Sequence, residues 1–436
     1  MIAGEPPTVF SGANMPSWAE KIAARYALHL TPDLVSWLDD GIWREPGGAE
    51  FSESLTPEEL LEPESDLIWG GFLPPDMIPL IGNDYGDWLA ARVDFDGQIS
   101  EVVYWCHGGG DWLTYGDSLA EALIFDAYFH FRYGQRVHQL DPDRRDSQIY
   151  HLADWARGEL GKRGLTIAPF WKDPDQITAQ DALSHLDDSG ICKVAIARER
   201  VLDALSHPLR THADPSMAAK LAWPWNPDFL RGLFDTELLS AGQRSDLTAI
   251  VESLSPSLEG QSWSVAENTC LDIGAKSPKI GWAWDIAGWS AERRGDRNAA
   301  IDRYQRGLTC SVFSSDSVSF YSHWYADGAG KFAAARLIEM GAEIEGPMAD
   351  YLGNMRGHDE RAMRRSVYEF WFASAESAAR NGDARGCYTD HYRSGWDVGL
   401  VELTTYSEIL ERLEQAAQRA QSESLARLAA LHRKSF

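Results

Sequence analysis

The alternation of apolar and polar positions predicts a small sheet in the first third of the chain. Two short runs, residues 87–94 and 98–105, are rich in Val, Ile, Leu, Tyr and Trp, which favour strands. An Asp-Gly pair at 96–97 separates them, and Asp-Gly supplies the positive φ angles that a tight hairpin turn requires. A proline-rich extended run at 72–81 and a shorter apolar run at 112–115 add two further predicted strands.

Predicted helices flank this sheet. Apolar residues recur at helical spacing in residues 17–30 and 33–39, and Thr56-Pro57 predicts one further helical turn. After the strands, a helix is predicted at 118–131, with Ser118 as its N-cap and Glu121 as the capping-box partner. We therefore expect residues 15–135 to form an α+β module, with a small antiparallel or mixed sheet and flanking helices, behind a loose leader at 1–14.

The pattern changes beyond residue 135, where the chain becomes mostly α-helical. The predicted helices occupy residues 147–163, 191–205, 228–239, 244–254 and a long amphipathic stretch at 404–434. Residues 164–190 show only weak periodicity and contain prolines that break helices. We divide this part into a helical middle region, 136–270, and a C-terminal region, 271–436, and expect the first module to have a core of its own.

A faint internal repeat lies in the C-terminal region. Its first copy has small residues, then Gly295-Asp296, then an A-x-x-x-Y pattern that ends at Tyr304, and Gly382-Asp383 occupies the matching turn of the second copy. The first copy resembles a tetratricopeptide unit, in which small residues let two helices approach closely. We therefore expect tetratricopeptide-like helical hairpins here.

The charge is strongly acidic and unevenly distributed. The 436 residues include 66 Asp and Glu against 40 Lys and Arg, a net charge of −26. Residues 1–140 contain 23 acidic and 6 basic residues, and residues 45–91 contain 11 carboxylates with no Lys or Arg. Such a surface repels nucleic acid and anionic membranes and attracts basic partners.

Other compositional features point to no cofactor, metal or membrane span. The five cysteines lie far apart, with no CxxC or Cys/His cluster, so neither a disulfide framework nor a zinc site is expected. No apolar run approaches the ~18 residues of a membrane span. The first residues lack the charged and apolar segments of a signal peptide, so we expect a cytoplasmic protein.

Several short motifs follow one another in a defined order in the first third of the chain. They are LTPDL from Leu30, WLDDG from Trp37, LTPEEL from Leu55, W-x-x-F-L-P-P-D-x-I-P-L from Trp69 and NDYGDWL from Asn83. With the predicted hairpin, this series resembles the SUKH superfamily, which includes fungal cell-wall-synthesis regulators and bacterial toxin-immunity proteins. The resemblance covers under a third of the chain, and it implies a non-enzymatic α+β fold without an invariant catalytic residue.

Two motifs in the sheet segment imitate a serine hydrolase. HGGG from His107 matches an oxyanion-hole signature, and GDSLA around Ser118 matches a serine elbow. In α/β hydrolases the elbow follows a parallel strand far downstream of the HGGG loop, whereas here five residues separate the two motifs. A glycine turn and a helix N-cap explain both motifs. A hydrolase built on His107 and Ser118 remains the remote alternative.

Acidic turns in the same segment imitate metal sites. Residues 94–99 match part of a calcium loop, but alignment on Gly97 puts Arg92 and Val103 at its first and last ligand positions. A metal or acid/base cluster would use Asp76, Asp84, Asp87, Asp111 and Asp117. Because Asp and Gly also form turns through local hydrogen bonds, we predict no metal site.

The acidic run and the family resemblance together favour protein binding. We interpret the chain as a non-catalytic, immunity-type protein that neutralises a basic toxin, such as a nuclease, through an acidic face. The candidate partner-binding residues are Glu58, Glu59, Glu62, Glu64, Asp66, Asp84, Asp87, Asp111 and, as an aromatic hot spot, Trp112. A regulatory scaffold that binds client proteins through its helical repeats is the alternative, and the oligomeric state stays open.

Overall fold

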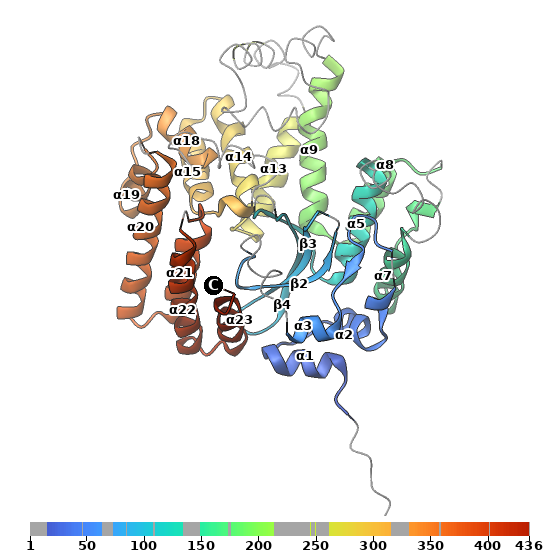
Figure 1. Ribbon diagram of the computed structural model, residues 1–436. Coiled ribbons are helices and arrows are strands. Elements are labelled where there is room, and N and C mark those ends of the chain that lie inside the picture. The colour runs from blue at the N-terminus through green and yellow to red at the C-terminus, as the bar shows by residue number, and fades with distance from the viewer. Residues whose placement is uncertain are drawn as a thin grey trace, which may run out of the picture.

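The fold is an antiparallel sheet with helices on both sides (Figure 1). The computed structural model describes residues 15–45, 47–62, 73–83, 85–107, 110–133, 149–172, 176–212, 261–314, 331–356, 359–400 and 402–435, together with residues 245 and 249. The predicted leader at 1–14, the helix predicted at 228–239 and most of the helix predicted at 244–254 lie outside these described residues.

Five strands form the sheet in chain order, each antiparallel to the next. They are β1 (Glu53–Ser54), β2 (Met77–Gly82), β3 (Trp88–Val93), β4 (Ile99–Trp105) and β5 (Trp112–Gly116). The predicted hairpin is confirmed as β3 and β4. In its turn Gly97 has a φ of 74°, and Asp94 Oδ1 accepts bonds from the backbone N–H groups of Asp96 and Gln98, both at 2.9 Å.

Helix α5 (Leu119–Tyr133) covers one face of the sheet. Helices α7 (His151–Lys162) and α8 (Ala179–Ser189) pack against α5 (Figure 1). The Tyr115 ring of β5 lies 4.8 Å from the Phe125 ring of α5. Ser118 Oγ accepts the N–H of Glu121 at 3.4 Å, as predicted for the N-cap. The Glu121 carboxylate does not play the predicted capping-box role, since it accepts the N–H groups of Asp117 and Cys192. Most side chains of α5 are buried, so this helix is apolar on nearly every side.

Short helices border the sheet near the start of the chain: α1 (Trp18–Tyr26), α2 (Pro32–Asp39), the 3-10 turn η1 (Ile42–Arg44) and α3 (Pro57–Leu61). Ser17 and Glu20 form a capping box that starts α1. The helix ends earlier than predicted, because Ala27 adopts a left-handed φ of 54°.

The remaining helices form an arc that starts at α9 and returns to the first module (Figure 1). Their bounds are α9 (Lys193–His212), α13 (Gln261–Lys276), α14 (Gly281–Arg293), α15 (Arg297–Leu308), α18 (Phe332–Glu339), α19 (Pro347–Asn354), α20 (Glu360–Arg380), α21 (Ala384–Trp396), α22 (Leu403–Arg419) and α23 (Glu423–Arg433). Two 3-10 turns, η3 (Phe170–Lys172) and η4 (Val312–Ser314), lie between helices. This composition confirms the predicted class, an α+β module followed by a mostly helical region.

Helical hairpins occupy both copies of the internal repeat, as α14 with α15 and α20 with α21. Each turn combines a glycine of positive φ with an aspartate that caps the second helix, at Gly295-Asp296 and Gly382-Asp383. A Cβ atom on Gly288 of α14 would lie 2.4 Å from the Tyr304 ring of α15. The small residue therefore permits the close approach that the sequence predicts.

Two further predictions about helices are wrong. The sequence predicts one long helix at 404–434, but the chain forms α22 and α23, because Gln421 adopts a left-handed φ of 60° and ends α22. The second helix then packs against the first. Helix α8 lies in the weakly periodic stretch and has no predicted counterpart, although Thr178 and Asp181 form the capping box that starts it.

The C-terminal helices close onto the start of the chain. Arg427 of α23 donates to the backbone carbonyl of Arg25, beside the end of α1, at 2.8 Å. Arg385 of α21 pairs with Asp96 in the β3–β4 turn at 3.0 Å. Buried apolar side chains form one cluster from Ala19 to Ala429 among the described residues. The predicted boundaries at 135 and 270 stay a prediction, and α7, α8 and α9 all pack on elements of the first module.

Candidate functional site

Three of the predicted partner-binding residues lie on α3 or at its C-cap. Glu58, Glu59 and Glu62 are exposed, whereas Pro57 and Leu60 face the core. The start of the helix is fixed by a capping box, in which Thr56 Oγ1 accepts the Glu59 N–H at 3.2 Å and the Glu59 carboxylate accepts the Thr56 N–H at 2.7 Å. Glu58 and Glu62, four residues apart, lie on the same side of this turn.

A further exposed carboxylate lies on the edge strand that precedes α3 in the chain. Glu53 of β1 is exposed, and we call Glu53, Glu58, Glu59 and Glu62 the acidic face. One cation lies next to it, since Arg25 Nε of α1 donates to the Leu61 carbonyl at 3.3 Å. All four residues of the acidic face belong to the segment 45–91, which itself contains no Lys or Arg.

Two other predicted contact residues, Asp87 and Asp111, lie inside the module. Asp87 accepts the backbone N–H of His107 and the Tyr104 hydroxyl, both at 2.9 Å, and its side chain is buried. Asp111 is 1% exposed in the turn between β4 and β5. The structure therefore separates both aspartates from the acidic face. Glu64, Asp66 and Asp84 lie outside the described residues.

The two residues of the hydrolase alternative lie at opposite ends of β5. His107 follows β4, whose Trp105 pairs with Trp112 at the start of β5, and Ser118 follows the far end of that strand. A five-residue strand spans roughly 16 Å, which is far beyond hydrogen-bond distance. Ser118 Oγ is buried and also accepts a bond from Arg163 Nη1 at 3.3 Å. The structure does not bring His107 and Ser118 together.

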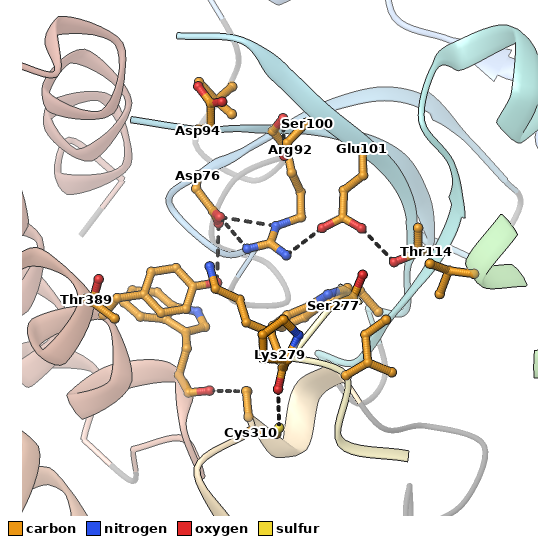
Figure 2. Close-up of a pocket in the computed structure, with 18 of the residues that line it drawn as sticks. Asp76, Arg92, Asp94, Ser100, Glu101, Thr114, Ser277, Lys279, Cys310 and Thr389 are labelled. Carbon is orange, nitrogen blue, oxygen red and sulfur yellow. Dashed lines mark hydrogen bonds and ion pairs between the residues drawn. The ribbon is translucent and has the colours of Figure 1, made fainter. Parts of the chain in front are cut away.

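A cavity of about 510 Å³ lies between the sheet and the C-terminal helices (Figure 2). Its walls come from β3, β4 and β5 on one side, and from α21, the loop between α13 and α14 and the residues before η4 on the other. Aromatic lining side chains are Phe95, Trp112, Trp282, Tyr388, Tyr392 and Trp396. Charged lining side chains are Asp76, Arg92, Asp94, Glu101, Asp117, Arg198, Lys279 and Arg393. Its volume is typical of small-molecule sites.

Arg92 on β3 holds the sheet wall of the cavity together (Figure 2). The strand register places Arg92 opposite Met77 on one side and Glu101 on the other. Arg92 Nη2 lies 2.6 Å from Asp76 Oδ2, and Arg92 Nη1 lies 2.8 Å from Glu101 Oε1. The side chains of Arg92 and Asp76 are 12% and 10% exposed, so this ion pair is largely withdrawn from water.

Further hydrogen bonds extend this cluster. Thr114 Oγ1 donates to Glu101 Oε2 at 2.6 Å, and the Tyr392 hydroxyl of α21 donates to Asp76 Oδ1 at 3.3 Å. The Arg92 guanidinium also lies 5.2 Å from the centre of the Trp112 ring. Trp112 is 7% exposed, so this predicted hot spot is a cavity wall rather than part of the acidic face.

Lys279 approaches the same cluster from the opposite wall (Figure 2). Lys279 is an exposed residue whose side chain lines the cavity. Partial desolvation by the cavity walls, together with the positive charge of Arg92, lowers the pKa of Lys279, and the carboxylates of Asp76 and Glu101 partly oppose that shift. Burial raises the pKa of Tyr392, and the nearby Asp76 adds to that shift. The hydroxyl is therefore a hydrogen-bond donor at neutral pH.

The acidic turns do not assemble a metal site in the described part of the chain. No group of three or more His, Cys, Asp and Glu side chains is placed to hold an ion there. Asp76, Asp87 and Asp117 lie in separate environments, since Asp76 pairs with Arg92, Asp87 bonds with Tyr104 and Asp117 is exposed at the start of α5. Among the described helices, none combines the length and apolar character needed to cross a bilayer.

The cavity has no counterpart among the sites that the sequence predicts. Its cations come from β3, from α9, from the loop before α14 and from α21, and only tertiary packing brings such distant segments together. One signal is present in the sequence, because Arg92 is the only Lys or Arg between residues 45 and 131. A single cation in an acidic strand segment indicates that nearby carboxylates surround it.

Comparisons with protein-family models, with curated proteins and with solved structures gave no match. The resemblance to the SUKH superfamily and to tetratricopeptide units therefore rests on the sequence motifs and stays a prediction.

Proposed function

We propose that this chain is a non-catalytic protein-binding protein whose acidic face binds a basic partner protein. We further propose that the partner is a toxin domain, most simply a nuclease, which the chain neutralises by covering its cationic surface. The observation that carries the proposal is the joint exposure of Glu53, Glu58, Glu59 and Glu62 within a segment that contains no Lys or Arg.

The physical basis is electrostatic complementarity. A nuclease presents Lys and Arg side chains to the phosphates of its substrate, so a dense group of carboxylates competes for the same surface. The net charge of −26 adds a long-range attraction for cations that speeds diffusional encounter. Charge pairs of this kind raise the association rate more than they raise affinity.

The proposal assigns different roles to the predicted contact residues. Glu58, Glu59 and Glu62 would contact the partner directly. Glu64, Asp66 and Asp84 belong to the same run of charge in the sequence and remain proposed contacts. Asp87, Asp111 and Trp112 are internal, so we assign them to the support of the module.

The proposal expects a gene beside this chain to encode a basic toxin domain, and that domain is the ligand of the test. The wild-type chain should inhibit the activity of that domain in a purified assay. The triple variant Glu58→Lys, Glu59→Lys and Glu62→Lys should bind at least ~10-fold more weakly, because it replaces attraction by repulsion at three contacts.

A matched control separates the acidic face from total charge. Glu343→Lys, Glu345→Lys and Glu408→Lys change the net charge by the same amount at exposed positions in the helical arc. This control should inhibit like the wild type. Equal inhibition by both triple variants would contradict the acidic face. Loss of inhibition in the control alone would favour a scaffold that binds through the helical hairpins.

A further inference from the structure

We propose that the cavity between the sheet and the C-terminal helices binds a small organic anion that also carries an aromatic or apolar group. The cavity is lined by other residues than those of the acidic face, so this proposal does not depend on the proposed partner.

The carboxylates of the central cluster already accept hydrogen bonds from protein donors. Asp76 accepts bonds from Arg92 and from the Tyr392 hydroxyl, and Glu101 accepts bonds from Arg92 and Thr114. A ligand cation would have to replace these donors. Of the other two lining carboxylates, Asp94 is bonded to its own turn and Asp117 is exposed at the far end of β5. The acidic groups therefore do not favour a cationic ligand.

Arg92 has donor capacity that an anion can use. A guanidinium has five N–H groups, and the hydrogen bonds of Arg92 to Asp76 and Glu101 use three of them. Lys279 reaches toward Arg92 from the opposite wall (Figure 2), and Arg393 of α21 lines the cavity beside it. An anion between the walls would accept hydrogen bonds from both Arg92 and Lys279 and would reduce the repulsion between these two positive charges.

The walls around these cations are suited to a ring. Trp112 and Tyr392 flank the central cluster, and Trp282 and Trp396 continue the aromatic lining. Flat apolar side chains bury a planar ligand with little loss of side-chain entropy. Ser100 and Lys279 are exposed, so the cavity is open to a ligand from solvent.

The titration of Lys279 agrees with this geometry. Partial desolvation by the cavity walls and the positive charge of the neighbouring Arg92 lower the pKa of Lys279, so its charged form is disfavoured there. A bound anion would stabilise the ammonium form, so binding should be accompanied by proton uptake at pH values near the pKa of Lys279.

Two fluorescent probes test the proposal on the full-length chain. Anilinonaphthalenesulfonate carries a ring system and an anionic group, and phenylnaphthylamine carries the same rings without the sulfonate. We expect saturable binding of the sulfonate and ~10-fold or weaker binding of the uncharged probe, from the loss of charge-assisted hydrogen bonds. Lys279→Met should weaken sulfonate binding by ~10-fold, whereas Lys279→Arg should retain it.

Lys276→Met is the control for charge and for loop integrity. Lys276 lies at the end of α13 and pairs with Asp272 at the surface, where both side chains are more than half exposed (69% and 63%). This variant should bind the sulfonate like the wild type. Equal affinity of the two probes, equal affinity of the two Lys→Met variants, or no saturable binding of the sulfonate would each overturn the proposal.

Discussion

The Tyr392 hydroxyl donates a hydrogen bond to Asp76 Oδ1 at 3.3 Å and joins two parts of the chain that are 316 positions apart. Asp76 precedes β2 in the sheet, and Tyr392 lies on α21 in the helical arc. Asp76 also pairs with Arg92, so the same carboxylate contributes to the sheet and to the contact between the sheet and the arc. Changes in this cluster should therefore affect the stability of the whole chain.

Arg92→Met should strongly destabilise the protein. The substitution leaves Asp76 and Glu101 without the cation that compensates their largely buried charges. Breaking a buried pair in this way costs about 3–5 kcal/mol. The measurement is the free energy of unfolding from urea titration.

Arg365→Met is the matched control for Arg92→Met. Arg365 pairs with Glu369 on the exposed side of α20, with side chains 80% and 60% exposed. Exposed pairs contribute about 1 kcal/mol or less, so this loss should be small. Similar losses in the two variants would show that the Arg92 cluster has no special role in stability.

Gly288→Ala should destabilise the first helical hairpin. The new Cβ atom would lie 2.4 Å from the Tyr304 ring, and α14 and α15 would have to separate. Overpacking of this kind costs about 1–3 kcal/mol. Gly158→Ala in α7 is the control, because nothing lies within 4 Å of its Cβ position and alanine favours a helix. A thermal melt of equal midpoint for both variants would contradict the close packing of α14 and α15.

Acid should destabilise the protein in part through His432 of α23. Burial lowers the pKa of His432 to about 4, below the usual value of 6.5. The unfolded chain therefore binds this proton first, so the contribution of His432 to stability is full above pH 6.5 and is lost as the pH falls toward 4. For one buried group this amounts to about 3 kcal/mol.

His432→Gln should reduce the pH dependence of the free energy of unfolding between pH 7 and pH 4. The exposed His185→Gln is the control. An unchanged pH dependence in His432→Gln would mean that His432 titrates alike in the folded and unfolded chains.

Residues 1–140 alone should fold less cooperatively than residues 1–212. The shorter fragment removes α7 and α8, which cover α5 on the side away from the sheet. Exposure of this apolar helix would favour a loosely packed state. Amide spectra and thermal melts of the two fragments provide the comparison. Equal dispersion and cooperativity would support the predicted independent core for residues 15–135.

Local chemistry made much of the fold predictable. Some signals determine the backbone conformation of residues only a few positions away. These are the Asp-Gly turn, the capping residues Ser118 and Thr56, and the glycine-aspartate turns of the hairpins. The break between α22 and α23 was not predictable in this way, because Gln421 adopts its left-handed conformation where α23 packs back onto α22. Tertiary packing decides that geometry, and no glycine or proline marks it.

The candidate sites also divide into features that the local sequence predicts and features that depend on tertiary packing. Exposure of Glu58, Glu59 and Glu62 agrees with the pattern of charge in the sequence. The sequence does not distinguish them from Asp87 and Asp111, since burial depends on partners such as Tyr104. The cavity was beyond prediction because Arg92, Lys279 and Tyr392 meet only after the arc closes on the sheet.

The most direct test of the proposed function is the rate of association with the basic toxin domain that the proposal expects beside this chain, measured by stopped-flow at low and high salt. Steering by the acidic face is screened beyond ~10 Å at 0.1 M salt and beyond ~3 Å at 1 M. We predict that the wild-type rate falls by ~10-fold or more over this range. Substitution of Glu58, Glu59 and Glu62 by Lys should slow association at low salt and flatten the salt dependence. An association rate that neither salt nor this triple variant changes would contradict the acidic face as the binding surface.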